Sequence, residues 1–231
     1  MGKKLPTTLL IVTLAWMILA SGMIFLYAPQ ELTMGEVQRI FYIHAPSGWV
    51  AGTAYFIVFL SSVVYLWKRS PLADDLAHAS AEVGFVFCSC LVVTGPLWAK
   101  PAWGIWWTWD ARLTLTFVLW LLFASYLMLR SYISNPGRAA TLAAVVGIIG
   151  FVDVPVDYMA IRWWRTQHPQ PVIAGGEGSG LDPRMFLTFM VCVGAFHCLF
   201  GYLLLQRFRL AAARRDLGAL RRALAIRPSE E

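Results

Sequence analysis

The chain has 231 residues, of which 58% are hydrophobic and only 14% are charged, and its mean hydropathy is +0.61. A water-soluble domain cannot cover so much apolar surface, so the composition predicts an integral membrane protein. The formal net charge of +6 would suggest nucleic acid as a partner if the chain were soluble. Here the basic residues gather at the ends of apolar runs and in the C-terminal tail, which is typical of membrane orientation, and we expect no nucleic-acid partner.

Six apolar runs are candidates for helices that cross a hydrocarbon layer of about 30 Å. We expect the spans at about residues 5–27, 45–67, 76–98, 111–129, 139–158 and 185–206. The fifth span is the weakest, because Asp153 and Asp157 fall inside it. We expect both aspartates to face protein or water near the outer end of that span.

Basic residues predict the orientation of these spans. Lys3 and Lys4 precede the first span, and many arginines follow the sixth, so both ends are expected on the cytoplasmic side. Two ends on one side require an even number of crossings, so the weak fifth span must cross. The sequence therefore predicts an all-α integral membrane protein with six transmembrane helices and both termini inside. Residues 1–206 form the six-helix domain, and residues 207–231 form a basic cytoplasmic tail.

The loop at residues 99–112, on the outer side between the third and fourth spans, holds an unusual density of tryptophan. It contains Trp103, Trp106, Trp107 and Trp109, followed by Asp110 and Arg112. The first three tryptophans are spaced i, i+3 and i+4, which predicts one helical turn with all three rings on one face. Such a face fits a flat apolar ligand with an anionic edge, and an aromatic belt at the lipid–water boundary is the alternative. Asp110 also stands where the N-cap of the fourth span belongs.

Two histidines are expected on the same outer side as this loop. His44 lies just ahead of the second span, with Pro46 in the first helical turn, and His168 follows a cluster that contains Trp163 and Trp164. Two neutral imidazoles are the usual axial pair of a six-coordinate haem iron, and tryptophan faces suit the porphyrin. The arginines that could pair with its propionates are Arg39, Arg112, Arg162 and Arg165.

The other two histidines serve as a control. His78 begins the third span at the inner side, and His197 lies deeper in the sixth. At 1.5 Å per residue their depths differ by roughly 10 Å, too much for both to bind one iron. We expect them to be packed or hydrogen-bonded. The four cysteines lie in apolar runs without a CxxC motif, so we expect small buried side chains rather than a disulfide or metal site.

The string Trp103-Gly104-x-Trp106-Trp107-x-Trp109-Asp110-x-Arg112 resembles the WWD signature of the haem-handling proteins of cytochrome c biogenesis. Over nearly its whole length the chain resembles the haem exporter protein C (CcmC) family, with six spans, one WWD loop and two flanking outer histidines. The resemblance implies a multi-pass protein of the bacterial cytoplasmic (inner) membrane. It further implies that haem b is held at the outer leaflet, with His44 and His168 as axial ligands of the iron and the tryptophan loop as a platform.

The same resemblance implies the partners. The haem would be delivered to a periplasmic haem chaperone, and the protein would associate with the membrane and ATPase subunits of an ABC transporter, a small single-span accessory subunit and membrane lipid. We expect no enzymatic activity of the chain itself, beyond assistance to covalent attachment of haem on the chaperone.

Two other functional classes remain as alternatives. A membrane electron-transfer subunit with a permanent bis-histidine haem would favour histidines within helices at matched depth, which the sequence does not show. A haem transporter proper would need polar groups along the bundle interior, and apart from Glu82, His197 and the two aspartates there are few. The pattern favours a haem-handling site at the outer surface.

Overall fold

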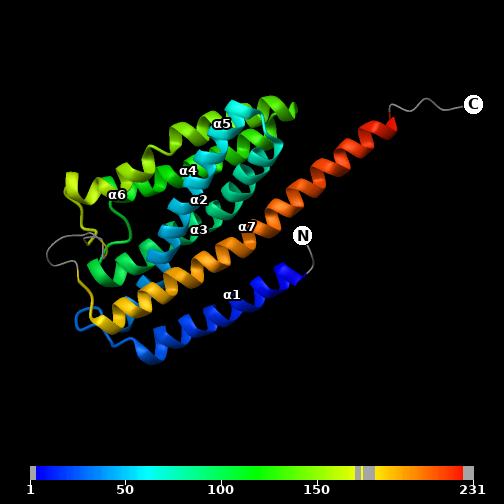
Figure 1. Ribbon diagram of the computed structural model, residues 1–231. Coiled ribbons are helices and arrows are strands. Elements are labelled where there is room, and N and C mark those ends of the chain that lie inside the picture. Colours follow the sequence, from blue (N-terminus) through cyan, green and yellow to red (C-terminus); the bar gives the residue numbers. More distant parts are fainter. Residues whose placement is uncertain (1–3, 170–172, 174–179, 226–231) are drawn as a thin grey trace, which may run out of the picture.

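The computed structural model describes residues 4–169, 173 and 180–225, and these form an elongated bundle of helices (Figure 1). The elements are α1 (Lys4–Gly22), the π-helical turn η1 (Met23–Tyr27), the 3-10 turn η2 (Glu36–Ile40), α2 (Phe41–Lys68), α3 (Pro71–Trp103), α4 (Ala111–Tyr132), α5 (Pro136–Gly150), α6 (Asp153–Trp163) and α7 (Pro183–Ala225).

Six helical segments in the described part of the chain are long and apolar enough to cross a membrane. They are Leu5–Tyr27, Glu36–Lys68, Pro71–Trp103, Ala111–Tyr132, Pro136–Trp163 and Pro183–Arg221. The prediction of an all-α protein with six transmembrane helices is confirmed. The start of α1 and the end of α7 lie toward the same end of the bundle, as an even number of crossings requires (Figure 1).

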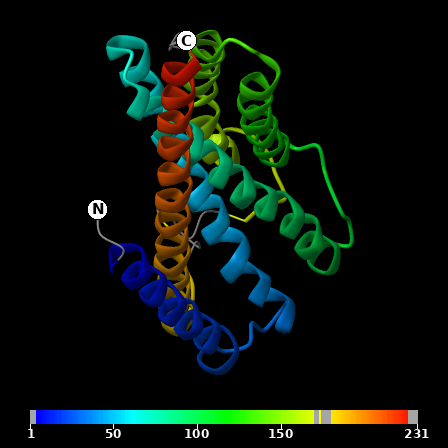
Figure 2. The ribbon, with the colours of Figure 1, turned by 90° about the vertical axis from the view of Figure 1, so that its right-hand side faces the viewer.

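Small side chains hold the centre of the bundle together. Ala51 and Ala54 of α2 and Ala77 and Ala81 of α3 are buried in the main core. Small residues allow two helix backbones to approach closely, which is how helices associate where lipid offers no hydrophobic driving force. The Ser80 hydroxyl of α3 donates a 2.9 Å hydrogen bond to the Ala54 carbonyl and ties the pair directly. By contrast, α1 lies at the edge of the bundle, packed mainly against α7 (Figure 2).

The second span starts earlier than the sequence predicted. Pro46 was placed in the first helical turn, but α2 begins at Phe41, and Pro46 lies inside it. Phe41 and Tyr42 are both buried among residues of α1, α3 and α7, so tertiary packing extends the helix toward its N-terminus. His44 is therefore held by a helix rather than by a loop.

The fifth span crosses as two helices, α5 and α6, which break at Phe151 and Val152. Proline explains the break, because Pro155 lacks the N–H that would bond to the Phe151 carbonyl in a continuous helix. Residues 136–163 together have the length to span, so the predicted crossing holds. The two aspartates of this span lie on α6, and Asp157 faces α4, in agreement with the expectation that it faces protein.

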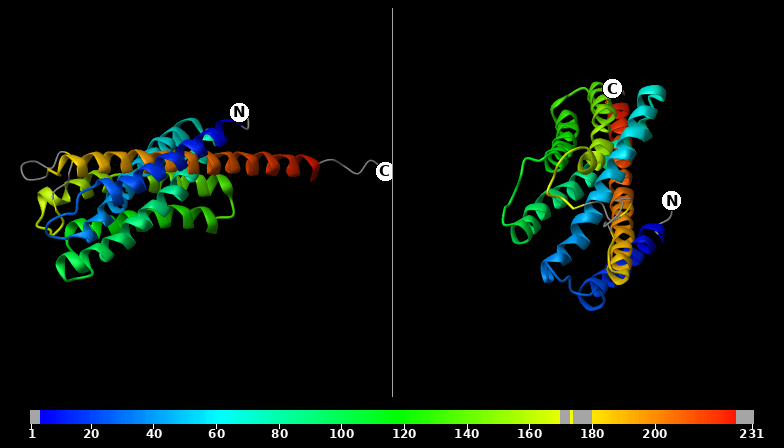
Figure 3. Two further views of the ribbon diagram at one scale, coloured as in Figure 1. Left: turned by 90° about the horizontal axis from the view of Figure 1, so that it is seen from below. Right: turned by 90° about the vertical axis from the view of Figure 1, so that its left-hand side faces the viewer.

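The last helix is unusually long. At 43 residues and 1.5 Å per residue, α7 measures about 65 Å, roughly twice the hydrocarbon thickness, and it extends well beyond its neighbours (Figure 3). The predicted tail thus continues the sixth span as one helix to Ala225. Two ion pairs, Arg207 with Glu82 and Arg215 with Asp75, tie the start of this extension to α3. Residues 226–231, Lys3, and parts of the loop before α7 lie outside the described residues.

Candidate functional site

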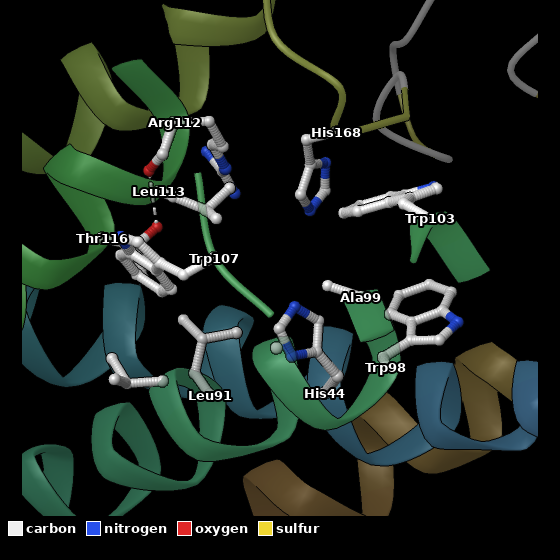
Figure 4. Close-up of a pocket in the computed structure, with 12 residues that line it drawn as sticks. His44, Leu91, Trp98, Ala99, Trp103, Trp107, Arg112, Leu113, Thr116 and His168 are labelled. Carbon is white, nitrogen blue, oxygen red and sulfur yellow. Dashed lines mark hydrogen bonds between the residues drawn. The ribbon is translucent and has the colours of Figure 1, made fainter. Parts of the chain in front are cut away.

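A pocket lies at the end of the bundle where α3 passes into the tryptophan loop (Figure 4). Helices α2, α3 and α4 and the segment after α6 all contribute to its walls. Its lining residues are His44, Leu91, Val92, Gly95, Trp98, Ala99, Trp103, Trp107, Arg112, Leu113, Thr116 and His168. Most of these are apolar or aromatic, and the polar members are two histidines, one arginine and one threonine.

His44 enters the pocket from α2, and its ring orientation is set by α3. Its Nδ1 lies 2.9 Å from the Thr94 hydroxyl. That hydroxyl donates its only proton to the Cys90 carbonyl, 2.7 Å away, so toward the histidine it can only accept. The His44 Nδ1 therefore carries the proton, and Nε2 holds a free lone pair.

His168 enters from the segment that follows α6, and short-range bonds hold it. Its Nδ1 lies 2.9 Å from the Pro169 carbonyl oxygen, and its backbone N–H donates to the Thr166 hydroxyl over 3.1 Å. A carbonyl only accepts, so Nδ1 again carries the proton and Nε2 is free. Burial, with the Arg112 charge nearby, lowers the pKa of His168 to about 4, so its imidazole is neutral at pH 7.

The two imidazoles face one another across the pocket. Figure 4 shows a ring nitrogen of His44 and one of His168 pointing toward each other from opposite walls. Because each Nδ1 is engaged with an acceptor, the facing nitrogens are the two Nε2 atoms. Two neutral nitrogen donors aimed at a common centre are the arrangement that a six-coordinate metal in a planar macrocycle requires.

The tryptophan loop is not the helical turn that its spacing predicted. Helix α3 ends at Trp103 because Gly104 adopts a left-handed conformation, with φ of 79°, that terminates it. Trp103 and Trp107 line the pocket, but Trp106 and Trp109 do not. The expected single face of three rings is therefore wrong, and the loop divides its tryptophans between the pocket and the surface.

The tryptophans outside the pocket have other contacts. Trp106 is 55% exposed and lies under the Lys100 ammonium, 5.9 Å from its ring centroid. Trp109 packs edge-on against Trp107 at 5.7 Å and against Phe117 of α4. It therefore contacts the pocket residue Trp107 without lining the pocket itself.

The tryptophan pair before His168 also lies outside the pocket lining. Trp163 and Trp164 pack on each other at 5.8 Å and are both about half exposed. They do not line the pocket. Their exposure is thus more typical of an aromatic anchor at the lipid–water boundary than of a surface that holds a ligand.

Arg112 is the arginine that reaches the pocket. Its guanidinium lies 3.3 Å from the Asp157 carboxylate of α6 and also donates to the Asp157 backbone carbonyl. Thr116, one turn further along α4, donates to the Arg112 carbonyl and lies within hydrogen-bond distance of the same carboxylate. The other three candidate arginines do not line the pocket, and Arg39 is paired with Glu36.

Asp110 lies next to the pocket wall and organises the end of the loop. One carboxylate oxygen accepts from the Leu113 backbone N–H at 3.2 Å, which makes the residue the N-cap of α4, as the sequence predicted. The other oxygen accepts from the Thr108 hydroxyl at 2.7 Å. Asp110 thus joins the loop to the helix rather than lining the pocket.

The remaining two histidines are hydrogen-bonded or lie beside a carboxylate, as the sequence predicted. His197 uses both ring nitrogens, at 2.8 Å to the Val193 carbonyl and 3.1 Å to the Thr53 hydroxyl, and His78 lies 3.8 Å from Glu82. All four cysteines are free and at least partly buried.

Sequence reasoning missed the contribution of α3 to the site. Trp98 packs edge-on against His44, with ring centroids 5.7 Å apart, and Thr94 fixes that histidine. Leu91, Gly95 and Ala99 lie on the same face of the helix. The spacing of these residues at three and four positions was the available signal, because it continues back from Trp103 along one helix face.

The whole chain resembles one family of proteins. Residues 1–223 match the family model described as heme exporter protein C. Heme exporter protein C of Bradyrhizobium diazoefficiens is 34% identical over 200 residues, which cover 87% of this chain and 76% of that protein. Heme exporter protein C of Haemophilus influenzae is 32% identical over 193 residues, covering 82% and 77%. A putative cytochrome c biosynthesis ccmC-like mitochondrial protein of Marchantia polymorpha is 30% identical over 174 residues, covering 75% and 73%. Since the family model spans nearly the entire sequence, this multi-pass membrane protein belongs to the haem exporter protein C (CcmC) family.

Proposed function

We propose that the protein binds haem b in the pocket between His44 and His168 and delivers it to a periplasmic haem chaperone for the biogenesis of c-type cytochromes. The observation that carries the proposal is the pair of facing Nε2 atoms, each freed by a hydrogen bond at its own Nδ1. A role in haem handling for cytochrome c maturation already follows from family membership. The residues of the pocket support the proposed position of the haem on the chain.

The other walls of the pocket also suit haem. Trp98, Trp103 and Trp107 offer aromatic surface to a macrocycle. The Arg112 guanidinium supplies a positive charge for a propionate.

The pocket lies at one end of the bundle, which favours a handling site over the two alternatives. A permanent electron-transfer haem needs two histidines inside the membrane, and His197 has both nitrogens engaged. A transport path needs ionisable groups in series through the bundle. Between the acidic pair on α6 and Glu82, the described core is built of apolar side chains, a few hydroxyl groups and His197.

We propose that the pocket lies on the periplasmic face of the cytoplasmic membrane, because the positive-inside rule predicts that the arginine-rich end of α7 is on the inner side. A handling site there would be open to a periplasmic chaperone. We further propose that the protein works with the membrane and ATPase subunits of an ABC transporter and with a small single-span accessory subunit. The chain itself would hold and present haem rather than act as an enzyme.

Haem spectroscopy of the purified protein tests the ligand set. Reconstituted with haem b, the protein should give a low-spin, six-coordinate spectrum. His44→Ala or His168→Ala should weaken binding and open a coordination position, and added imidazole should partly restore the spectrum. His78→Ala and His197→Ala are the matched controls and should leave the spectrum unchanged. If the control variants lose haem while His44→Ala keeps a normal spectrum, the proposal is wrong and the protein is a cytochrome of another kind.

A transfer assay tests the delivery step. Haem-loaded protein mixed with the periplasmic chaperone should pass its haem to the chaperone, and His168→Ala should reduce the amount transferred. If His44→Ala and His168→Ala transfer as much haem as the unchanged protein does, the pocket is not the donor site.

A further inference from the structure

We propose that Thr94 is a positioning residue for His44, so that the Thr94 hydroxyl sets how tightly haem is held. The proposal rests on the proposed function, since it concerns how one of the two axial ligands is prepared for iron. It goes beyond that function because it assigns a role to a side chain of α3 that does not itself line the pocket.

A continuous hydrogen-bond chain carries the argument. The Cys90 carbonyl accepts from the Thr94 hydroxyl at 2.7 Å, and the Leu91 carbonyl lies 3.3 Å from the same oxygen. With its proton directed to the helix backbone, the hydroxyl presents only lone pairs to the His44 Nδ1 at 2.9 Å. The backbone of α3 thereby determines the tautomer of a histidine on α2.

The same contact also fixes the rotation of the ring. Trp98 packs edge-on against the His44 imidazole. A Cβ atom added at Gly95 would lie only 3.4 Å from the Cε1 atom of His44. The ring therefore lies close against the surface of α3, with Thr94 as its polar anchor. In this orientation Nε2 is directed across the pocket toward His168 (Figure 4).

The two candidate axial ligands thus differ in the hydrogen bonds that orient them. His44 is bonded to a different helix, 50 residues away in sequence, and both helices belong to the central pair of the bundle. Within the described residues, the hydrogen bonds of His168 are to Thr166 and Pro169 of its own segment. The His44 side is therefore the half of the clamp that is tied to a second helix. We expect changes at Thr94 to affect affinity through this half alone.

Metal-binding histidines commonly donate their second ring N–H to an acceptor, which orients the ring and raises its basicity as a ligand. Loss of such an acceptor typically lowers metal affinity by about 10- to 100-fold. We therefore expect Thr94→Val, which keeps the shape of the side chain but removes the hydroxyl, to raise the dissociation constant for haem by about that factor. Thr94→Ser keeps the hydroxyl and should restore near-normal affinity.

The chain offers a matched control for this substitution. Thr53 of α2 donates to its own backbone at Trp49 and lies 3.1 Å from the Nε2 of His197, so it is a second threonine–histidine pair in the same bundle. Thr53→Val should leave haem affinity and the haem spectrum unchanged. If Thr53→Val weakens haem as much as Thr94→Val does, the effect is general loosening of the bundle, and the proposal fails.

A measurement without haem tests the tautomer directly. The chain has only four histidines, so ¹⁵N labelling of histidine gives a small set of ring signals, and His44→Ala identifies those of His44. In the haem-free protein, His44 should show the Nδ1–H tautomer, and Thr94→Val should shift it toward the Nε2–H form. Thr94→Ser should leave it unchanged.

The combined results separate this proposal from the proposed function. If His44→Ala abolishes the low-spin spectrum but Thr94→Val changes neither the tautomer nor the affinity, the ligand assignment stands and the role of Thr94 is overturned. If His44→Ala leaves the spectrum intact, the proposed function itself has failed. The expected pattern is loss with His44→Ala, a partial loss with Thr94→Val, and rescue with Thr94→Ser.

Discussion

The contact between Arg112 and Asp157 joins two helices at the wall of the pocket. Both side chains are largely buried, with exposed fractions of 22% and 10%, and they lie 3.3 Å apart. Removing one member of a buried ion pair leaves an unpaired charge and costs about 3–5 kcal/mol, whereas replacing both by apolar residues of similar size costs far less. The stability of the protein should thus depend on whether one partner or both partners are replaced.

We expect Asp157→Leu to destabilise the protein strongly and Asp157→Leu combined with Arg112→Met to recover most of the loss. Unfolding in mixed detergent micelles, followed by circular dichroism, measures the difference. The double variant should nevertheless bind haem less tightly, because it lacks the guanidinium for a propionate. If the double variant loses as much stability as the two single variants lose together, this interpretation of the pair is wrong.

Trp106 and Trp107 are neighbours in the sequence but have different surroundings, so they form a natural comparison. Trp107 lines the pocket, and Trp106 is mostly exposed beside Lys100. An aromatic pair is worth about 0.5–1.5 kcal/mol beyond area burial, so Trp107→Ala should weaken haem retention roughly 2- to 13-fold. Trp106→Ala should leave retention nearly unchanged.

Transfer should be more sensitive than retention to the loss of Trp107. A displacement of about 1 Å in a reacting group can lower a rate on the order of a hundredfold. Haem bound per protein and haem received by the chaperone, measured for both variants, give the comparison. Equal fractional losses of both quantities in Trp107→Ala would mean that the ring is a binding surface only.

At the scale of single elements, the loop between α3 and α4 is defined by its two ends. Gly104 terminates α3 in the left-handed conformation, and Asp110 caps α4 while it accepts from Thr108 inside the loop. Loss of a helix N-cap costs about 1 kcal/mol. Because the same carboxylate also holds Thr108, its loss frees the segment that carries Trp107.

We therefore expect Asp110→Ala to lower stability by about 1 kcal/mol and to reduce haem retention as well. Asp110→Ser keeps a capping oxygen but cannot serve both partners, so it should recover stability more fully than retention. Thermal unfolding and haem titration of the two variants provide the test. If Asp110→Ser restores both quantities equally, the aspartate is only a cap.

The sequence predicted the helices well and the loop poorly, and the reason is physical. Length and hydropathy decide whether a helix spans a membrane, so five crossings could be found from the apolar runs, and the weak fifth span followed from the parity of the basic residues. The ring arrangement in the loop depends on the backbone of one residue, Gly104, whose helix-terminating role competes with the i, i+3, i+4 spacing of the tryptophans. The glycine was the better signal. Similarly, Pro46 indicated a helix start, but burial of Phe41 and Tyr42 extended the helix past it.

The site shows the same division. Residue type and expected topology were enough to propose His44, His168, Trp103, Trp107 and Arg112. All five of these residues line one pocket. Thr94 and Trp98 could not, because they lie within an apolar run where a threonine or tryptophan usually has only a packing role. Their importance comes from the side-by-side placement of α2 and α3, which is a property of tertiary structure.

At the scale of the whole molecule, the two ends of the bundle have separate chemistry. One end holds the pocket, and the other holds the ion pairs of α7 with α3, Arg207 with Glu82 and Arg215 with Asp75. Effects of changes at distant sites without shared partners usually add. Damage at the end opposite the pocket should therefore lower stability without changing the haem spectrum.

Two truncations of α7 test this separation. Ending the chain after Gln206 removes both arginines and leaves the carboxylates of Glu82 and Asp75 without these partners, so we expect a clear loss of thermal stability. Ending it after Asp216 keeps both ion pairs and should behave like the full chain. In both truncated proteins the haem spectrum should match that of the full chain, because the pocket lies at the other end of the bundle. Equal stability of the two truncations would show that the ion pairs do not stabilise this end of the bundle. An altered spectrum in either truncation would show that the two ends are coupled.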